Sequence, residues 1–301
     1  MVQWFGVALG IASSALGGTA AAVTRYLVVS ADAITLALLR FGIGFLGVLP
    51  VALALRVRWP KPADWPAAGL LGLSFFGGFF VLYNVAVSYT TAARASLALS
   101  TLPLQTMVVG ALLGRERLSF RKSVGVAVAV GGVAAALVTG LGDAPPGAWR
   151  GEMVMTGAVL CMAVYSVFSR ELVRRSSTLG FLAFGMGVGS LALLAVALAL
   201  GRLTVLGGFG WPEWTGGLYL GIAGGALAFV LWVLALEHAS PTRVANTMAV
   251  NPLAAALLAA VLVHEPLTWN LGAGVIAVLA GIWIATTQPD ARRTPHQEAP
   301  E

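Results

Sequence analysis

Charged residues are scarce in this chain of 301 residues, and acidic residues are the scarcest of them. Asp, Glu, Lys and Arg make up 10% of the sequence, with 12 acidic against 18 basic residues. Soluble domains carry about 25% charged residues, whereas hydrophobic residues here reach 58% and the mean hydropathy is +0.89. The composition therefore excludes an ordinary soluble domain and predicts a protein built almost wholly of membrane spans.

Cysteine is nearly absent, since Cys161 is the single one. One thiol excludes a disulfide framework and a cysteine-based metal site, so we interpret Cys161 as a small packing residue. The sequence also lacks an HExxH motif, a paired-aspartate constellation for proteolysis and a P-loop for ATP. We therefore predict that the protein is not an enzyme and needs no metal or organic cofactor.

What the sequence does contain is a series of apolar runs separated by short polar breaks. Each run has about 20 residues, the length that crosses a bilayer core, and the 37 glycines suit closely packed helices. The predicted fold class is an all-α integral membrane protein with ten transmembrane helices. We place the spans at roughly 4–24, 33–55, 66–88, 93–113, 121–141, 152–172, 178–200, 214–236, 242–263 and 269–287.

The chain also repeats itself at an offset of 149 residues, without a gap. Apolar sequences match by chance at Leu, Ala and Gly, but rarely at Trp, Arg, Pro and Glu in one register, which indicates an internal duplication. We predict a first five-helix repeat at 1–141, a second at 142–287 and a disordered cytoplasmic tail at 288–301. The matched pairs include Trp65 with Trp214, Arg94 with Arg243, Pro103 with Pro252, Glu116 with Glu265 and Gly132 with Gly281.

An odd number of helices in each repeat predicts that the second copy is inverted in the membrane. Inverted repeats are typical of secondary transporters, which bind substrate near the bilayer midplane. If the N-terminus is cytoplasmic, 13 of the 18 basic residues fall in cytoplasmic segments, 4 on the opposite side of the membrane and 1 within a span. We therefore expect an inner-membrane protein with both termini in the cytoplasm. The basic residues behind the net charge of +6 then lie mainly in loops, and no nucleic-acid partner is expected.

Two tracts carry a resemblance to a known family. TTAARASLALSTLPLQTMVVGALLGRERLSFRKSVGVAVAVGGVAAAL and its second copy ASPTRVANTMAVNPLAAALLAAVLVHEPLTWNLGAGVIAVLAGIWIA share a small or polar helix start, a mid-helix Pro, a Glu after the helix and a Gly-containing last helix. Together with LLRF at 38–41, they resemble the EamA-type repeat of the drug/metabolite transporter superfamily. The resemblance implies a ten-helix exporter or permease for amino acids, other metabolites, sugars or nucleotide sugars.

Polar and aromatic side chains at membrane depth are the candidates for a substrate site. Such groups usually face the protein interior or a water-filled path, although a single Ser or Thr more often fills a seam between helices. Tyr83 falls on Trp232 at the 149 offset, so the two could face each other across one central site or fill separate seams. The candidates are Tyr83, Asn84, Gln105, Tyr165, Trp232, Asn246 and Asn251, with Ser13, Ser14, Thr101 and Ser166 as weaker ones.

Arg40 is the single basic residue within a span, about 10 Å along the helix from the nearer end. A guanidinium there could hold a substrate carboxylate, or it could extend toward Asp32, lipid headgroups or loop carbonyls. Pro103 and Pro252 lie near the middle of the fourth and ninth spans, where proline kinks a helix. The kinks could gate a cavity or could only shape packing.

Glu116 and Glu265 fall in loops, where we expect each to cap the helix that follows it. Arg94 and Arg243 start helices at the membrane interface and are also expected to be structural. No acidic residue lies well inside a span, which argues against exchange of a cationic drug for protons.

These observations favour a secondary transporter for small neutral or zwitterionic metabolites, with amino-acid export as the preferred activity. The alternatives are a sugar or nucleoside permease of the same fold, and a channel or membrane scaffold without alternating access. The expected partners are a small-molecule substrate and the lipid bilayer, and the expected state is a monomer or weak homo-oligomer.

Overall fold

The computed structural model describes residues 2–114, 120–139, 144–238 and 247–286 of the chain. Within these ranges every regular element is a helix, and no strand occurs. Glu116, Arg243 and Asn246 lie outside the described residues, as does the tail predicted to be disordered.

Among the described residues, seven helical stretches are long and apolar enough to cross a membrane. Three shorter apolar helices coincide with parts of the fifth, ninth and tenth predicted spans, namely Ser123–Thr139, Val250–Leu262 and Trp269–Gly281. The seven long stretches are Trp4–Leu27, Ala33–Ala54, Pro62–Tyr89, Ala92–Leu112, Ala148–Arg175, Thr178–Ala199 and Trp211–Ala235.

Several of these stretches contain more than one regular element. In the first half the helices are α1 (Val2–Leu27), α2 (Ala33–Ala54), α3 (Trp65–Gly72), α4 (Phe80–Tyr89), α5 (Ala92–Leu99), α6 (Leu102–Leu112) and α7 (Phe120–Thr139). In the second half they are α8 (Ala148–Arg175), α9 (Thr178–Ala199), α10 (Trp211–Gly221), α11 (Ala228–His238), α13 (Val250–Leu262) and α14 (Trp269–Thr286).

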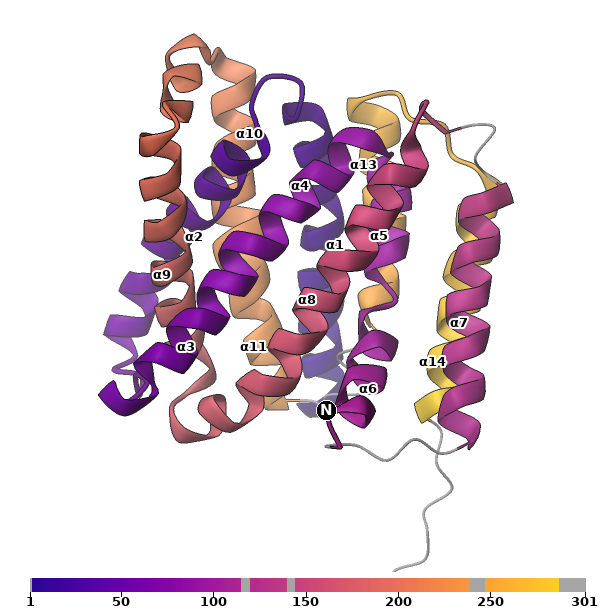
Figure 1. Ribbon diagram of the computed structural model, residues 1–301, viewed down its shortest axis with the longest axis horizontal. Coiled ribbons are helices and arrows are strands. Elements are labelled where there is room, and N and C mark those ends of the chain that lie inside the picture. The colour runs from indigo at the N-terminus through magenta and orange to yellow at the C-terminus, as the bar shows by residue number, and fades with distance from the viewer. Residues whose placement is uncertain (1, 115–119, 140–143, 239–246, 287–301) are drawn as a thin grey trace, which may run out of the picture.

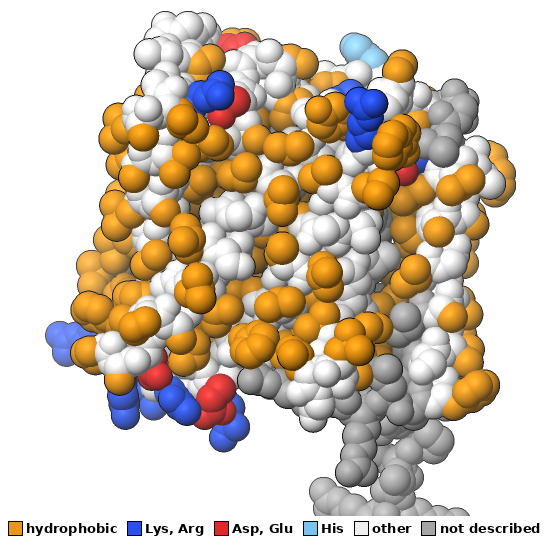
Figure 2. Space-filling view, in the orientation of Figure 1, with side chains coloured by type: hydrophobic (Ala, Val, Ile, Leu, Met, Phe, Trp, Pro, Cys, Tyr) orange, Lys and Arg blue, Asp and Glu red, His pale blue; other side chains and the backbone are white. Residues whose placement is uncertain are grey.

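The two halves of the chain are interleaved (Figure 1). Helix α1 packs against α11 and α13, α2 against α9 and α10, α4 against α8, and α7 against α14. Each of these contacts joins the first half to the second. Charged side chains on the face in Figure 2 gather near the two ends of the bundle, and the band between them is apolar. That distribution is what a bundle embedded in lipid requires.

Small residues allow α7 and α14 to pack closely at one edge of the bundle (Figure 1). A Cβ on Gly132 would overlap the side chain of Ala277, and a Cβ on Gly281 would overlap Ala129. Gly132 and Gly281 are 149 residues apart, so equivalent glycines of the two halves serve the same contact from opposite sides. Close approach of backbones through small residues is how helices gain packing energy in lipid.

One end of the bundle carries the loops that follow α1, α4 and α13, and we call it the first-loop end. There Arg25, in the last turn of α1, pairs with Glu265 at 3.1 Å and donates to the carbonyls of Val87 and Ser88. Glu265 also accepts a hydrogen bond of 3.0 Å from the Ala92 amide, at the start of α5. The expectation that Glu265 caps its own following helix is therefore wrong, because its carboxylate caps a helix of the other half.

A second ion pair lies at the same end. Arg94, in the first turn of α5, contacts Glu152 of α8 at 2.6 Å and donates to the carbonyl of Leu137 at 2.5 Å. The Thr90 hydroxyl also donates to Glu152, at 3.4 Å. Two mostly buried ion pairs thus connect the halves at the first-loop end, and Arg94 has the structural contacts expected of it.

The α7–α14 contact generates the first prediction. Gly132→Ala should lower the melting temperature of the purified protein in detergent, because the added methyl group has no space against Ala277. Overpacking of this kind destabilises by about 1–3 kcal/mol. Gly131→Ala is the matched control, since a Cβ there meets nothing within 4 Å. Alanine is the better helix former, so the control should melt at the wild-type temperature or above it. Equal melting temperatures for the two variants would contradict the close contact.

Candidate functional site

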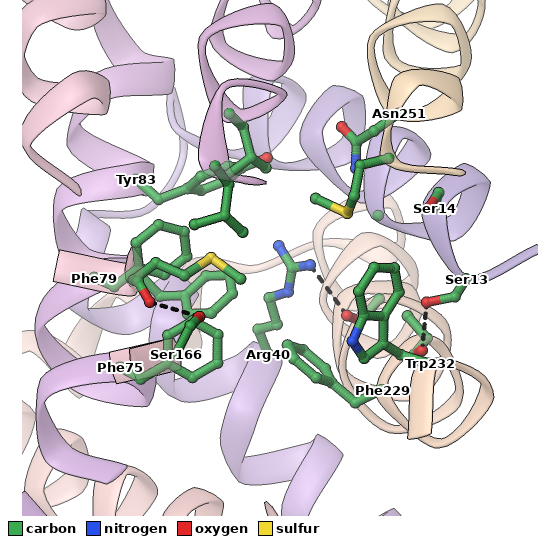
Figure 3. A pocket seen from close by; sticks show the side chains of 18 residues that line it. Ser13, Ser14, Arg40, Phe75, Phe79, Tyr83, Ser166, Phe229, Trp232 and Asn251 are labelled. Atoms are coloured by element: carbon green, nitrogen blue, oxygen red, sulfur yellow. Dashed lines mark hydrogen bonds between the residues drawn. The ribbon is translucent and has the colours of Figure 1, made fainter. Parts of the chain in front are cut away.

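A cavity of about 190 Å³ lies inside the bundle, lined by 18 residues from both halves of the chain. The lining comes from α1, α2, α4, α5, α6, α8, α11 and α13, together with irregular segments between some of these helices. Figure 3 shows the side chains pointing toward a shared space, with Arg40 reaching its middle. An engineered apolar cavity of about 150 Å³ can hold benzene, so the space suits a small organic molecule.

The duplication organises this cavity. Sixteen of the 18 lining residues form eight pairs separated by 149 positions, and the remaining two are Ser14 and Arg40. The two halves therefore contribute equivalent sequence positions to one cavity. The pairs are Ser13 with Met162, Gly17 with Ser166, Phe75 with Gly224, Phe79 with Ala228, Phe80 with Phe229, Tyr83 with Trp232, Leu99 with Met248, and Leu102 with Asn251.

Two π-helical segments run beside the cavity at equivalent positions. The first, Leu73–Phe79, joins α3 to α4, and the second, Ile222–Leu227, joins α10 to α11. Their first residues are 149 apart, so the same distortion occurs in both halves. Segments of π-helix are rare and are frequent at functional sites.

Interruptions rather than simple kinks accompany the two prolines expected to bend helices. Helix α5 ends at Leu99 and α6 begins at Leu102, so Pro103 lies in the first turn of a new helix. Pro252 is likewise the third residue of α13, after a 3₁₀ turn at Thr247–Ala249. A first-turn proline is tolerated because its missing N–H would have no partner within the helix.

The polar groups at the first interruption are satisfied locally. The Thr101 hydroxyl donates to the carbonyl of Ala98 at 2.7 Å, and the Ser100 hydroxyl donates to the carbonyl of Ser96 at 3.0 Å. Side-chain hydroxyls therefore supplement the backbone hydrogen bonds to the same carbonyls, which accept the Ser100 and Thr101 amides.

Aromatic rings form one wall of the cavity. The Phe79 and Phe80 rings lie 4.5 Å apart between centroids, Phe75 stacks on Phe79 at 5.3 Å, and Phe229 approaches Phe75 at 6.1 Å. The composition of an apolar chain conceals such residues, so these four phenylalanines were not among the predicted site residues. The match of Phe80 with Phe229 at the 149 offset is the signal that could have identified two of them.

Arg40 of α2 is 5% exposed and projects into this aromatic surround (Figure 3). Its Nη2 donates to the carbonyl of Gly224 at 3.0 Å, and its guanidinium lies 4.8 Å from the Phe80 ring centroid. It does not extend to Asp32, whose carboxylate instead caps α2 through the amides of Ile34 and Thr35. The interpretation of Arg40 as reaching outward is therefore wrong, and the bonded carbonyl belongs to the second π segment.

The other predicted residues divide into those that reach the cavity and those that do not. Tyr83, Trp232 and Asn251 line it, and in Figure 3 Tyr83 and Trp232 lie on opposite sides of Arg40. Ser13, Ser14 and Ser166, ranked lower from the sequence, line it as well.

Asn84, Gln105 and Tyr165 were predicted to line the site and lie outside it. Asn84 donates to the carbonyl of Ala33 at 2.9 Å and so joins α4 to the start of α2. Gln105 donates to the Thr101 hydroxyl at 3.1 Å. The Tyr165 ring stacks on the far side of the aromatic wall, 4.5 Å from Phe75. Each therefore supports the structure around the cavity rather than its surface, and Asn246 is not described.

Comparison with known proteins agrees with this architecture. The sequence matches the EamA-like transporter family over residues 4–138 and again over 149–287. An uncharacterized transporter of Archaeoglobus fulgidus is 25% identical over 94% of this chain and 98% of its own length. The uncharacterized transporter YetK of Bacillus subtilis is 28% identical, covering 93% of this chain and 87% of its own.

Two further similarities concern a named activity and the fold. A protein of Streptantibioticus cattleyicolor named a probable terminal-alkyne amino-acid exporter is 28% identical over 82% of this chain and 84% of its own. A solved crystal structure with 24% identity superposes with a TM-score of 0.66, covering 93% of this chain and 95% of that one. The chain therefore belongs to the EamA-like transporter family of the drug/metabolite transporter superfamily and is a multi-pass membrane protein.

Proposed function

We propose that this protein is a secondary transporter that moves small neutral or zwitterionic metabolites, amino acids first among them, by alternating access around the central cavity. The observation that carries the proposal is the cavity itself, lined by eight pairs of equivalent residues from the two halves. A site on the axis between two such units is where inverted-repeat transporters bind substrate. Within this proposal the bundle has ten spans, the second repeat is inverted, and both termini lie in the cytoplasm.

The lining chemistry supports small polar metabolites over cationic drugs. No Asp or Glu occurs among the 18 lining residues, which leaves no carboxylate there to exchange a proton for a cation. Serine hydroxyls, an asparagine amide and a guanidinium supply hydrogen bonds instead. Amino-acid export is preferred because one relative is named for that activity.

The first-loop end supports the alternating-access part of the proposal. The ion pairs Arg25–Glu265 and Arg94–Glu152 each join the first half to the second there. Opening of the cavity toward this end must separate contacts of this kind. Burial raises the pKa of the Glu265 carboxyl above its ordinary value, although Arg25 and the Ala92 amide act in the opposite direction. The closed arrangement therefore binds a proton more tightly than an arrangement that exposes Glu265 to water, and falling pH favours closure.

The transport prediction concerns exchange of labelled solute in proteoliposomes loaded with unlabelled solute. Amino acids should be exchanged with saturation, while sugars, nucleosides and a lipophilic cation should not. Trp232→Ala should lower the exchange rate about tenfold, the effect of about 1.4 kcal/mol of lost contact. Trp269→Ala, at an exposed tryptophan at the start of α14, is the control and should retain the wild-type rate.

Other outcomes of that experiment would assign another function. Exchange of sugars or nucleosides alone would indicate a permease for those compounds. Proton-dependent uptake of the cation alone would contradict the inference from the missing carboxylate. No exchange of any solute would indicate a channel or scaffold.

The gating prediction concerns access to the cavity. In a variant whose Cys161 is replaced by Ala, a cysteine at Ser14 reports on the cavity through its rate of reaction with a small charged thiol reagent. Glu265→Gln should lower this rate several-fold, because the neutral amide mimics the protonated carboxyl that the closed arrangement favours. Glu171→Gln is the control, since its partners Arg174 and Arg175 are exposed on its own helix.

The same labelling measurement tests the pKa of Glu265. The wild-type rate, divided by the Glu265→Gln rate to cancel the chemistry of the reagent, should fall as the pH is lowered toward 4.5, the ordinary value for this carboxyl. A ratio that rises or stays constant would contradict closure by proton binding.

A further inference from the structure

Arg40 is a buried cation without an ion-pair partner among the residues that the structure describes. Its Nε and Nη1 atoms have no hydrogen-bond partner in the described part of the chain, and none of the ion pairs found there involves it. The Tyr83 ring lies 5.9 Å from the guanidinium carbon, and the Phe80 ring covers the guanidinium at 4.8 Å. A buried cation left without a counter-charge is strongly unfavourable, so this arrangement suits an anionic group that enters with a ligand.

Arg40 is one of the two lining residues that have no lining partner at the 149 offset. Its equivalent in the second half is Gly189, which lies outside the lining. The second half also accommodates it, because Gly224 stands where the first half has Phe75. A Cβ on Gly224 would already lie 3.6 Å from Nη2 of Arg40. The larger ring of a phenylalanine would therefore take the place of the guanidinium. A ligand that binds Arg40 is held by one half and meets different chemistry in the other.

Hydrogen-bond acceptors lie elsewhere on the same cavity. The Oδ1 atom of Asn251 is buried and has no partner among the described residues. Ser13 donates its hydroxyl proton to the carbonyl of Ala228 at 2.7 Å, and Ser166 donates its own to the carbonyl of Met162 at 2.8 Å. Both serine oxygens therefore keep lone pairs for a donor in the cavity. In Figure 3 Asn251 and Ser13 lie to one side of the Arg40 guanidinium.

The wall formed by Phe75, Phe79, Phe80 and Phe229 offers no hydrogen bonds. It provides an apolar surface and aromatic faces within a volume of about 190 Å³. A branched or aromatic side chain is the group that such a wall accepts, and the volume limits it to a few carbon atoms beyond the charged groups.

We propose that Arg40 and Asn251 bind the carboxylate and the ammonium group of a zwitterionic amino acid, whose apolar side chain lies against the phenylalanine wall. This assignment rests on the transport function proposed above and names its substrate class. A planar guanidinium can hold a carboxylate through two parallel hydrogen bonds. The ammonium group donates to Oδ1 of Asn251 and to the serine oxygens, so no acidic side chain is required.

The test is equilibrium binding of labelled L-leucine to the full-length protein in detergent. Leucinamide and leucinol, which lack the carboxylate, should compete about 100-fold more weakly than leucine, and 4-methylpentanoate, which lacks the amine, about tenfold more weakly. Arg40→Met should weaken leucine about 100-fold and leave leucinol unchanged. Arg40→Lys should weaken leucine binding about tenfold, because lysine keeps the positive charge but cannot form the two parallel hydrogen bonds of a guanidinium.

Asn251 has a matched control in Asn270, which is also buried with an unpartnered Oδ1 but lies outside the cavity lining. Asn251→Ala should weaken leucine about tenfold and leave the affinity for 4-methylpentanoate unchanged, whereas Asn270→Ala should change neither. The melting temperature of ligand-free Arg40→Met should equal or exceed that of the wild type, because an unbalanced buried charge is removed.

Three results would overturn the assignment while leaving transport intact. They are wild-type affinity for leucine in Arg40→Met, equal binding of leucine and leucinol by the wild type, and equal losses for both ligands in Arg40→Met together with a lower melting temperature. The last result would give Arg40 a structural role through its bond to Gly224. If the wild type neither binds nor exchanges any amino acid, both the transport proposal and the assignment fail.

Discussion

A helix surrounded by lipid cannot leave its backbone polar groups unpaired, and the rest of this structure depends on that constraint. Irregular backbone at membrane depth is tolerated where protein or an aqueous cavity surrounds it. Four irregular segments adjoin the cavity in the described bundle: the two π segments, the interruption after α5 and the 3₁₀ turn before α13. Residues within or directly beside every one of them line the cavity. The cavity is therefore located where irregular backbone is shielded from lipid.

The cavity combines equivalent positions with unlike side chains. Paired positions supply the walls, yet Phe75 is paired with Gly224 and Phe79 with Ala228, so the two halves contribute surfaces of different shape. The chemistry at those positions differs where polarity matters, since Leu102 is paired with Asn251 and Gly17 with Ser166. Arg40 corresponds to Gly189, which does not line the cavity. A symmetric framework can thus present different groups to the two ends of one small molecule.

Much of the fold was predictable because span length and hydropathy follow from bilayer thickness. Seven of the predicted spans appear as long apolar helices, and shorter apolar helices lie in the other three. The pairing of Tyr83 with Trp232 also followed from the 149 offset, and both residues line the cavity. The position of a residue along its span and the internal repeat can both be read from the sequence without knowing how the helices pack.

Orientation around each helix was much less predictable. Tyr83 and Asn84 are neighbours of similar depth, yet successive helical residues point about 100° apart, and Asn84 reaches α2 instead of the cavity. The same uncertainty affected Tyr165 and Ser166, of which the smaller residue lines the site. The π segments add to the difficulty, because they rotate every residue beyond them by an amount that regular periodicity does not anticipate. The sequence allowed Arg40 either to enter a substrate site or to extend toward the membrane surface for a related reason. The direction of its side chain depends on a hydrogen bond to Gly224, which lies 184 residues away in the sequence.

The two π segments also record part of the history of the chain. A π segment usually marks the insertion of one residue into an α-helix. An insertion in one copy alone would have shifted the alignment of the halves by one position from that point onward. The 149 register instead continues through Leu73–Phe79 and Ile222–Leu227 to Gly132 and Gly281 without a gap. The register therefore carries no sign of an insertion in one half alone, which is the pattern expected if the π distortion preceded duplication of a shorter chain.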